Sequence, residues 1–274
     1  MTSRSVLLGL ASVVLALSAA WSPRAGAAPP ADRSTLRVYA AASLAEAFDE
    51  LGHVLELRRP GLKVRMSFAG SQQLASQLVQ GARADVFAAA DARSMQDVKD
   101  HGLLERRPEL FACNRMVVIV PATNPARIMR LQDLARAGVK LVVCAEAVPA
   151  GHYSRDVLRS LSREAGFERD FAARTLKNVV SEEDNVRAVL AKVQLGEADA
   201  GIVYRSDVGA KLLRHVNVLE LPAAANALTE YPIGLLKGAR APEPARAFVD
   251  LVLSAEGQQI LARHGFLPVG SSTR

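Results

Sequence analysis

Cysteine and aromatic residues are scarce in this 274-residue sequence. It contains two Cys, at positions 113 and 144, one Trp, and 5% aromatic residues in all. Two thiols cannot form the disulfide framework of a small secreted scaffold, so they are expected either as a single disulfide or as two buried free thiols. Because Lys and Arg are dispersed and few aromatic side chains accompany them, the composition also argues against nucleic-acid binding.

Long apolar runs are missing from residue 28 onward, so no transmembrane helix is expected there, and that part contains no linker rich in Gly, Ser or Pro. The one long apolar run, Val6 to Ala20, follows Arg4 and precedes Ala25-Gly26-Ala27. A charged start, a short apolar run and a small-residue cleavage site are typical of a secretory signal peptide. We therefore predict a signal peptide over residues 1–27 and a mature chain that starts near Ala28 and is periplasmic.

The mature chain carries only a mild positive charge. Removing the predicted signal peptide takes away Arg4 and Arg24 but no acid, which leaves 32 basic and 28 acidic residues and a formal net charge of +4. Such a field favours the approach of small anions.

Short β-rich segments alternate with amphipathic stretches along the mature chain. Helical spacing is clear at Leu44, Ala47, Phe48 and Leu51, and again over 186–193. The expected strands are Leu36 to Ala42, Leu62 to Phe68, Ala84 to Ala89, Met116 to Val120, Val139 to Val143 and Asp199 to Tyr204. This alternation predicts βαβ units, and hence an α/β fold with largely parallel sheets.

The length of the mature chain favours two α/β lobes over one large domain. With two lobes, strands must cross between them, and the candidates are Glu109 to Pro121 and Val216 to Lys237. We predict lobe I over 28–112 and 222–274, and lobe II over 113–221.

Polar or Gly/Pro turns precede four of the expected helices. Ser43 directly follows a strand and Ser71 follows another after Ala69-Gly70, both at positions typical of N-caps, and Ala150 and Val186 lie at the other two helix starts. A helix N-terminus offers unpaired N–H groups and the positive end of a dipole, so several aimed into one crevice would bind an anion. The alternative is that each Ser only caps its helix.

The sequence at these junctions resembles the periplasmic molybdate-binding proteins of ABC transporters. The resemblance covers nearly all of the mature chain, although Arg83 stands where Pro is expected, and we expect its charge near the rim of the crevice. The matching segments are Ala40 to Leu44, Phe68 to Ser71, Gly81 to Ala88, Val148 to Gly151, Asn185 to Arg187, Gly201 to Tyr204 and Phe248 to Pro268.

The resemblance implies a two-lobed type II periplasmic binding protein with its ligand in the cleft between the lobes. It implies a monomeric receptor, not an enzyme, that captures molybdate, and tungstate as well, and delivers it to an inner-membrane ABC permease with its ATPase. No other cofactor, no bare metal cation and no catalytic residue is expected. The ligand-binding residues that it implies are Ser43, Ser71, Ala150, Val186 and Tyr204.

Two alternatives remain open at this point. The first is another tetrahedral oxyanion: sulfate, thiosulfate or phosphate. Hydrogen phosphate carries a proton and needs an acceptor in the site, which Glu182, Glu183 or Asp184 could supply. The second is a periplasmic hydrolase that uses Ser71 or Cys113, with His152 as a base for the thiol.

Overall fold

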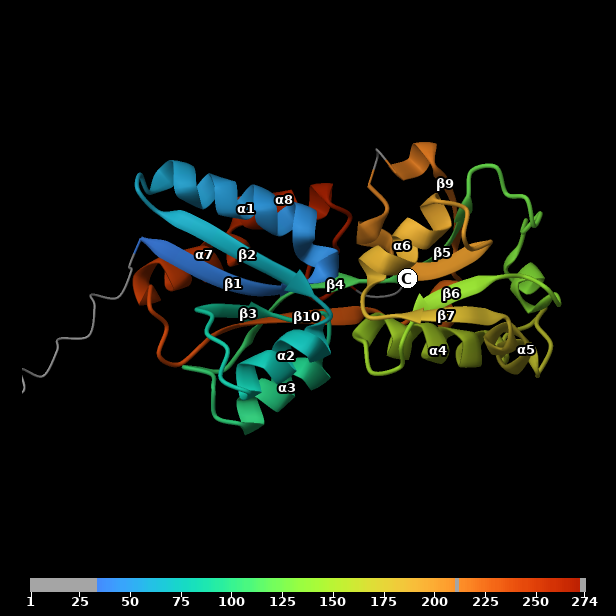
Figure 1. The fold of residues 1–274 in the computed structure, drawn as a ribbon, viewed down its shortest axis with the longest axis horizontal. Helices are drawn as coiled ribbons and strands as arrows, with labels where there is room; N and C mark the ends of the chain where they lie inside the picture. The colour runs from blue at the N-terminus through green and yellow to red at the C-terminus, as the bar shows by residue number, and fades with distance from the viewer. Residues whose placement is uncertain (1–33, 210–211, 272–274) are drawn as a thin grey trace, which may run out of the picture. The chain divides into compact units, whose positions relative to one another are not determined.

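Two five-stranded sheets form the framework of the computed structural model, which describes residues 34–209 and 212–271 (Figure 1). The first sheet has the strand order β2-β1-β3-β10-β4, and β10 runs antiparallel to both of its neighbours, whereas β1 is parallel to β2 and β3. Its strands are β1 (Thr35–Ala41), β2 (Lys63–Ala69), β3 (Val86–Ala88), β4 (Glu109–Asn114) and β10 (Thr229–Leu235).

The second sheet has the order β7-β6-β8-β5-β9. Here β5 is the strand antiparallel to its two neighbours, and β6 is parallel to β7 and β8. Its strands are β5 (Met116–Pro121), β6 (Leu141–Cys144), β7 (Val179–Glu183), β8 (Ala200–Tyr204) and β9 (Val216–Glu220). The prediction of mostly parallel α/β sheets is therefore confirmed, and each of the six expected strands lies within two residues of an observed one.

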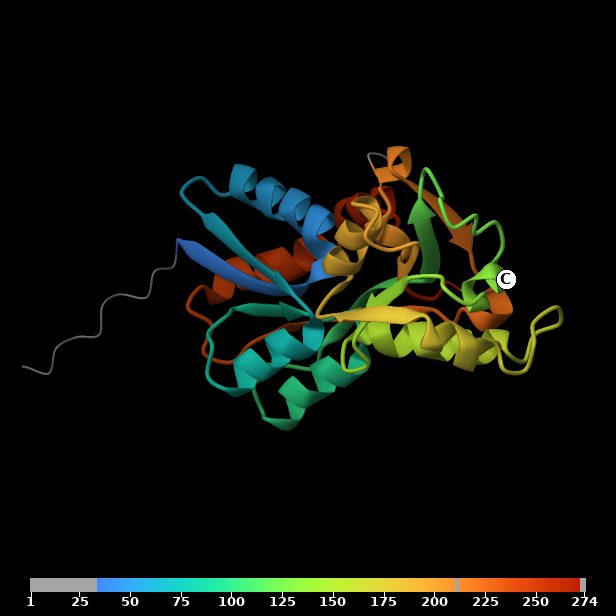
Figure 2. The same ribbon diagram turned by 45° about the vertical axis from the view of Figure 1, so that its right-hand side comes forward.

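Helices cover both faces of the first sheet. The helices α1 (Ala45–Arg58), α7 (Pro242–Leu253) and α8 (Ala255–Arg263) pack on one face, and α2 (Ser71–Val79) and α3 (Ala92–Asp100) on the other (Figures 1 and 2). Because both faces are covered, the strand side chains are buried: Val38, Ala40, Val86 and Ala88 are completely inaccessible.

The second sheet is covered in the same way. The helices α4 (Pro149–Leu161) and α5 (Phe171–Lys177) lie on one side, and α6 (Val186–Gln194) on the other. Five short 3-10 helices complete the described fold: η1 (Ala42–Leu44), η2 (Leu131–Ala135), η3 (Arg205–Asp207), η4 (Leu212–Arg214) and η5 (Ala223–Ala225).

The chain passes between the sheets where β4 leads into β5 and where β9 leads into β10, so both predicted crossings are confirmed. Arg115 alone separates β4 from β5. The lobe ranges that we predicted from the sequence stay predictions, and the predicted signal peptide, 1–27, lies outside the described residues.

At the end of the first sheet that lies opposite the two crossings, the buried carboxylate of Asp85 holds neighbouring segments together by hydrogen bonds. It accepts main-chain hydrogen bonds from Arg37 (2.7 Å), Arg240 (2.6 Å) and Ala241 (3.3 Å). Three donors from two distant segments compensate the desolvation of this buried charge. Asp85, which lies in the resembling segment Gly81 to Ala88, therefore has a structural role.

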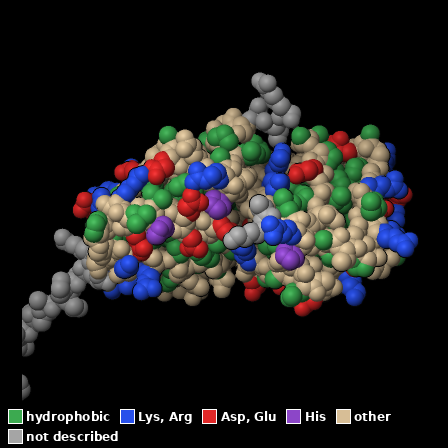
Figure 3. Space-filling model, turned by 90° about the horizontal axis from the view of Figure 1, so that it is seen from above, with side chains coloured by type: hydrophobic (Ala, Val, Ile, Leu, Met, Phe, Trp, Pro, Cys, Tyr) green, Lys and Arg blue, Asp and Glu red, His purple; other side chains and the backbone are tan. Residues whose placement is uncertain are grey.

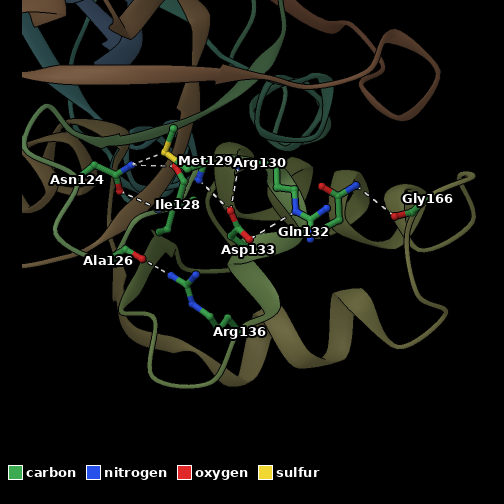
Figure 4. Close-up of polar contacts among 9 residues, drawn as sticks. All are labelled: Asn124, Ala126, Ile128, Met129, Arg130, Gln132, Asp133, Arg136 and Gly166. Carbon is green, nitrogen blue, oxygen red and sulfur yellow. Dashed lines mark hydrogen bonds and ion pairs between the residues drawn. The ribbon is translucent and has the colours of Figure 1, made fainter.

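The long connection from β5 to β6 is ordered by its own side chains (Figure 4). Asn124, in the left-handed region with φ of 41°, accepts from the Ile128 N–H (2.9 Å) and donates to the Ile128 carbonyl (3.0 Å). The Asp133 carboxylate accepts from the main-chain N–H groups of Met129 and Arg130. These side-chain hydrogen bonds satisfy main-chain groups that are not paired within a sheet or an α-helix.

No helix in the part of the chain that the structure describes is long and apolar enough to cross a membrane.

Candidate functional site

One small pocket collects all five residues that the resemblance implied. Ser43 and Ser71 line it from the side of the first sheet, and Ala150, Val186 and Tyr204 from the side of the second. The remaining lining residues are Ala41, Ala42, Ala69, Gly70, Ala90, Val148, Pro149 and Asn185. The pocket therefore lies where segments from both sheets meet.

The pocket is small and carries no formal charge. The centre of a water-sized sphere can occupy only about 20 Å³ of it, and none of the lining residues is Lys, Arg, His, Asp or Glu. A space of this size holds roughly one small polar species. A sugar or a peptide is too large for it in this conformation.

The two serines are not helix caps, so that expectation is wrong. Ser43 lies inside η1, and Leu44, not Ser43, is the N-cap of α1. Ser71 is the first residue of α2, and Gly70 holds the N-cap position. Each hydroxyl instead bonds to a distant segment: Ser43 Oγ lies 3.0 Å from Tyr231 Oη, and Ser71 Oγ accepts from the Ala90 N–H at 2.9 Å. Both serines are buried and belong to the pocket wall.

Helix N-termini supply main-chain donors to the pocket. Asn185 caps α6 by accepting from the N–H groups of Arg187 (3.0 Å) and Ala188 (3.2 Å), which leaves that of Val186 free. Pro149 opens α4, and Ala150 follows it. Within the described part of the chain, the N–H groups of Ser71, Ala150 and Val186 donate no hydrogen bond. These three N–H groups lie at the positive ends of α2, α4 and α6.

Tyr204 contributes a hydroxyl that has no partner in the described part of the chain. The residue is 1% exposed and ends β8, and its Oη is fully buried without a hydrogen bond. Burial raises the pKa of this phenol well above its usual value, so the hydroxyl keeps its proton. A buried hydroxyl of this kind is costly unless it meets a ligand or a water.

The two sides of the pocket touch beside it. A Cβ added to Gly70 would lie 2.6 Å from the Asp184 main-chain oxygen, so only glycine allows this approach. Arg187, at the start of α6, forms an ion pair with Glu46 in α1 and donates to the Ala42 carbonyl at 3.4 Å. Burial alone would raise the pKa of Glu46, but the Arg187 guanidinium outweighs it, and the pKa lies below its usual value.

The acidic residues that could have accepted a ligand proton are engaged elsewhere. The Glu182 carboxylate pairs with Arg155, and that of Glu183 accepts from Lys192 and Ser181. Neither residue lines the pocket, and neither does Asp184. The pocket wall therefore presents no carboxylate to a protonated anion.

The features expected of a hydrolase are not assembled here. The pocket wall contains no acid or base beside Ser71. Cys113 and Cys144 are free and buried, in β4 and β6, and burial raises the pKa of both thiols. His152 pairs with Asp156 within α4 (3.3 Å).

No group of three or more metal-ligating side chains that could hold a metal ion occurs among residues 34–209 and 212–271. The expectation that Arg83 lies at the rim of the crevice is wrong. It precedes β3, whereas the pocket lies beyond the other end of that strand, and it lines a separate hollow with Lys237.

A second groove lies between the elements of the two sheets and is lined by charged residues. Glu46, Arg187, Asp207, Arg263 and His264 belong to it. Figure 3 looks down on the face formed by the elements at the top of Figure 1, and side chains of both charges and His gather there. Asp207 is 5% exposed and one of its oxygens, Oδ1, has no partner among the described residues.

Comparison with known proteins gives consistent results. A family model described as bacterial extracellular solute-binding protein matches residues 36–267. The chain is 41% identical over 240 residues to the molybdate-binding protein ModA of Mycobacterium tuberculosis, covering 88% of this chain and 87% of that protein.

Two solved structures share the fold. The periplasmic molybdate-binding protein of Azotobacter vinelandii has a TM-score of 0.72 at 20% identity, covering 85% of this chain and 98% of that one. The sulfate-binding protein SubI of M. tuberculosis has a TM-score of 0.77 at 17% identity and covers 88% of each chain. The chain therefore belongs to the bacterial extracellular solute-binding protein family and has the two-lobed α/β fold of type II periplasmic binding proteins.

Proposed function

We propose that this protein is a periplasmic receptor that binds molybdate, and tungstate as well, through Ser43, Ser71, Ala150, Val186 and Tyr204. The observation that carries the proposal is the buried Tyr204 hydroxyl, which has no partner in the described part of the chain and lies in a small neutral pocket that also receives three helix N-termini. The relatives named as molybdate-binding proteins support the choice of ligand.

The chemistry of the wall favours a small dianion without a proton. Its neutral donors, the hydroxyls and helix N–H groups, stabilise negative charge without a counter-ion. A hydrogen phosphate ion needs an acceptor for its proton, and the wall offers no carboxylate for that purpose. Molybdate, tungstate and sulfate all meet this requirement, and they differ in size.

We further propose that a signal peptide over residues 1–27 directs the chain to the periplasm, where the mature protein acts as a monomer. In this role it hands the bound oxyanion to an inner-membrane ABC permease, which an ATPase drives. The match to the extracellular solute-binding family supports a transport role rather than catalysis.

Thermal unfolding of the mature protein with low-micromolar oxyanions tests the proposal. A ligand that binds only the native state raises the melting temperature, and the rise grows with ligand concentration. We expect molybdate and tungstate to raise it, and phosphate to have no effect at the same concentration. A rise with sulfate or thiosulfate alone would assign the site to a different oxyanion, and no rise with any of them would refute the proposal.

A further inference from the structure

A buried chain of hydrogen bonds runs from the crossing between the sheets to the pocket. Asn114, the last residue of β4, donates from Nδ2 to Tyr231 Oη (3.3 Å), and Tyr231 Oη lies 3.0 Å from Ser43 Oγ. Asn114 and Tyr231 have no exposed surface, and Ser43 is 4% exposed. Of these three residues only Ser43 lines the pocket.

The orientation of the Asn114 amide is fixed at its oxygen. Oδ1 accepts from the main-chain N–H of Arg115 at 2.9 Å. A flipped amide would place its NH₂ group against that N–H, donor against donor. The NH₂ group therefore points the other way, where it donates to Ser206 Oγ (2.8 Å) and to Tyr231.

This orientation decides where the Tyr231 proton goes. Its Oη accepts from Asn114, and in the described part of the chain Ser43 Oγ is its one other hydrogen-bond partner. If Ser43 donated to Tyr231, the buried phenol would accept twice and its own proton would have no acceptor. Tyr231 therefore donates to Ser43, and burial keeps that proton in place by raising the pKa of the phenol well above its usual value.

The hydroxyl proton of Ser43 then has no acceptor in the described part of the chain, so it is free to point into the pocket. The same holds for Ser71, whose oxygen accepts from the Ala90 N–H. Both serine hydroxyls receive a bond from the protein, so each offers the ligand a donor. The bond that makes Ser71 a donor to the ligand comes from a main-chain N–H, whereas for Ser43 it comes from the side chain of Tyr231, which can be mutated.

We propose that Tyr231, itself oriented by Asn114, is a positioning residue that fixes Ser43 as a hydrogen-bond donor. Through Ser43 it sets the preference of the site for fully deprotonated tetrahedral oxyanions over singly protonated ones. The inference rests on the proposed function, since it concerns the same pocket, and it adds a specificity-determining residue that does not touch the ligand.

The ring and the hydroxyl of Tyr231 can be separated experimentally. The ring packs edge-on against Phe111 (6.2 Å), Tyr204 (5.8 Å) and Phe266 (5.4 Å between centroids). Tyr231→Phe keeps these contacts and removes the hydroxyl, which is the donor to Ser43 and the acceptor from Asn114; the Asn114 NH₂ group keeps its bond to Ser206 Oγ. In that variant the Ser43 oxygen is free to accept a proton from a ligand.

The test compares selenate with hydrogen arsenate at mildly alkaline pH, in competition with molybdate. Both are tetrahedral dianions of similar size, and only hydrogen arsenate carries a proton. In the parent protein we expect selenate to bind more tightly. In Tyr231→Phe we expect this preference to fall by about 10-fold, because Ser43 can now accept. The molybdate Kd should rise only about 3-fold, since an untethered hydroxyl has three staggered positions.

Tyr39→Phe is the matched control, because Tyr39 is a half-buried tyrosine on β1 outside the pocket wall. It should leave the selenate-to-arsenate ratio unchanged. A second variant, Asn114→Asp, replaces the donor to Tyr231 by an acceptor and so reverses the chain of bonds. It should lower the same ratio at least as far as Tyr231→Phe, and its added charge acts on both dianions alike.

The outcomes separate the two proposals. A parent that binds neither molybdate nor tungstate refutes the proposed function. A parent that binds molybdate, with a ratio unchanged in both folded variants, refutes the role of Tyr231 alone. Should one variant fail to unfold cooperatively on heating, the other one decides the question.

Discussion

The buried hydroxyl of Tyr204 is unfavourable in the ligand-free protein and favourable once a ligand accepts its hydrogen bond. It is fully buried at the end of β8 and has no partner in the described residues. A buried donor without an acceptor costs free energy, and a bond to a charged acceptor repays it. Removal of this hydroxyl should therefore weaken ligand binding without lowering the stability of the ligand-free protein.

Tyr204→Phe tests that expectation, since it deletes the hydroxyl and keeps the ring beside Tyr231. A hydrogen bond to a charged group is worth about 1.5–3 kcal/mol, so the molybdate Kd should rise roughly 10- to 150-fold. The ligand-free protein should be as stable as the parent or more stable by up to about 1 kcal/mol. Titration calorimetry and urea unfolding measure the two quantities. A Kd within about twofold of the parent would exclude Tyr204 as a ligand.

The sequence allowed us to predict the positions of the candidate site residues from local patterns, but not their hydrogen-bond partners in distant segments. Ser43, Ser71, Ala150 and Val186 lie at strand-to-helix junctions, which are visible in the chain order. The partners of the two serines were not predictable, because Ser43 and Tyr231 are 188 positions apart. A serine after a strand resembles an N-cap, and only the fold shows that another segment takes its hydroxyl.

At the level of elements, the strands buried on both faces were predictable, and so was the edge strand β2, whose side chains alternate between more and less exposed positions, whereas the edge strands β7 and β9 were not. The central strands β5, β6 and β8 are buried at every position. The edge strands β7 and β9 have partly exposed patterns, so no continuous apolar run identifies them. β10 contains Pro232, which argues against a strand, but the register shifts there in a bulge that accommodates it.

The start of α2 is also an element-scale feature, because Gly70 lets it approach the opposite lobe. A Cβ at this position would lie 2.6 Å from the Asp184 main-chain oxygen, although φ of −60° and ψ of 137° suit any residue. The side-chain atoms of Gln72 lie equally close, but they can rotate away. The clash with Asp184 is relieved only if the lobes move apart.

We therefore expect Gly70→Ala to weaken molybdate binding without destabilising the ligand-free protein. A steric conflict of this kind costs about 1–3 kcal/mol, which corresponds to a Kd roughly 5- to 150-fold higher. Gly209→Ala is the matched control, because a Cβ there meets no atom of the described residues within 4 Å. Calorimetry gives both affinities. Equal Kd values for the two variants would show that the approach at Gly70 is not required for binding.

The stability of the whole molecule should depend on pH through Asp207, in the wall of the second groove. Burial raises the pKa of this carboxyl to about 7, although the Arg187 guanidinium and the Tyr204 N–H oppose the rise and Glu46 adds to it. The ordinary value is 3.8. Between these two values the native state holds a proton that the unfolded chain has lost, so the free energy of unfolding falls as the pH rises.

Asp207→Asn removes this dependence and keeps an oxygen that can accept from the Tyr204 N–H. We expect the ligand-free parent to lose on the order of 2–4 kcal/mol between about pH 4 and pH 7 relative to the variant. Above about pH 8, where the carboxyl is ionised in both states, the difference should stay constant. Urea unfolding across this range measures it, and a constant difference from pH 4 upward would show that Asp207 is already ionised at pH 4.

The two crossings of the chain determine how the whole molecule can move. Ser43 and Ser71 approach the ligand from the first sheet, and Ala150, Val186 and Tyr204 from the second. The sheets are joined at Arg115 and by the segment from β9 to β10. A rotation about these two connections would open the pocket and separate the two groups of donors. An oxyanion bonded to both groups stabilises the closed arrangement and shifts the population towards it.

Solution scattering should therefore show a smaller radius of gyration for the mature protein with saturating molybdate than without it. Gly70→Ala provides the control, because its added methyl group opposes closure: at a molybdate concentration that saturates it by calorimetry, it should contract less than the parent. The free energy for closure comes from the difference in affinity between the two arrangements, so an anion that binds both equally produces no contraction. If calorimetry shows saturation and the radius of the parent does not change, the pocket is already closed without ligand, and molybdate must enter by a local movement at its rim.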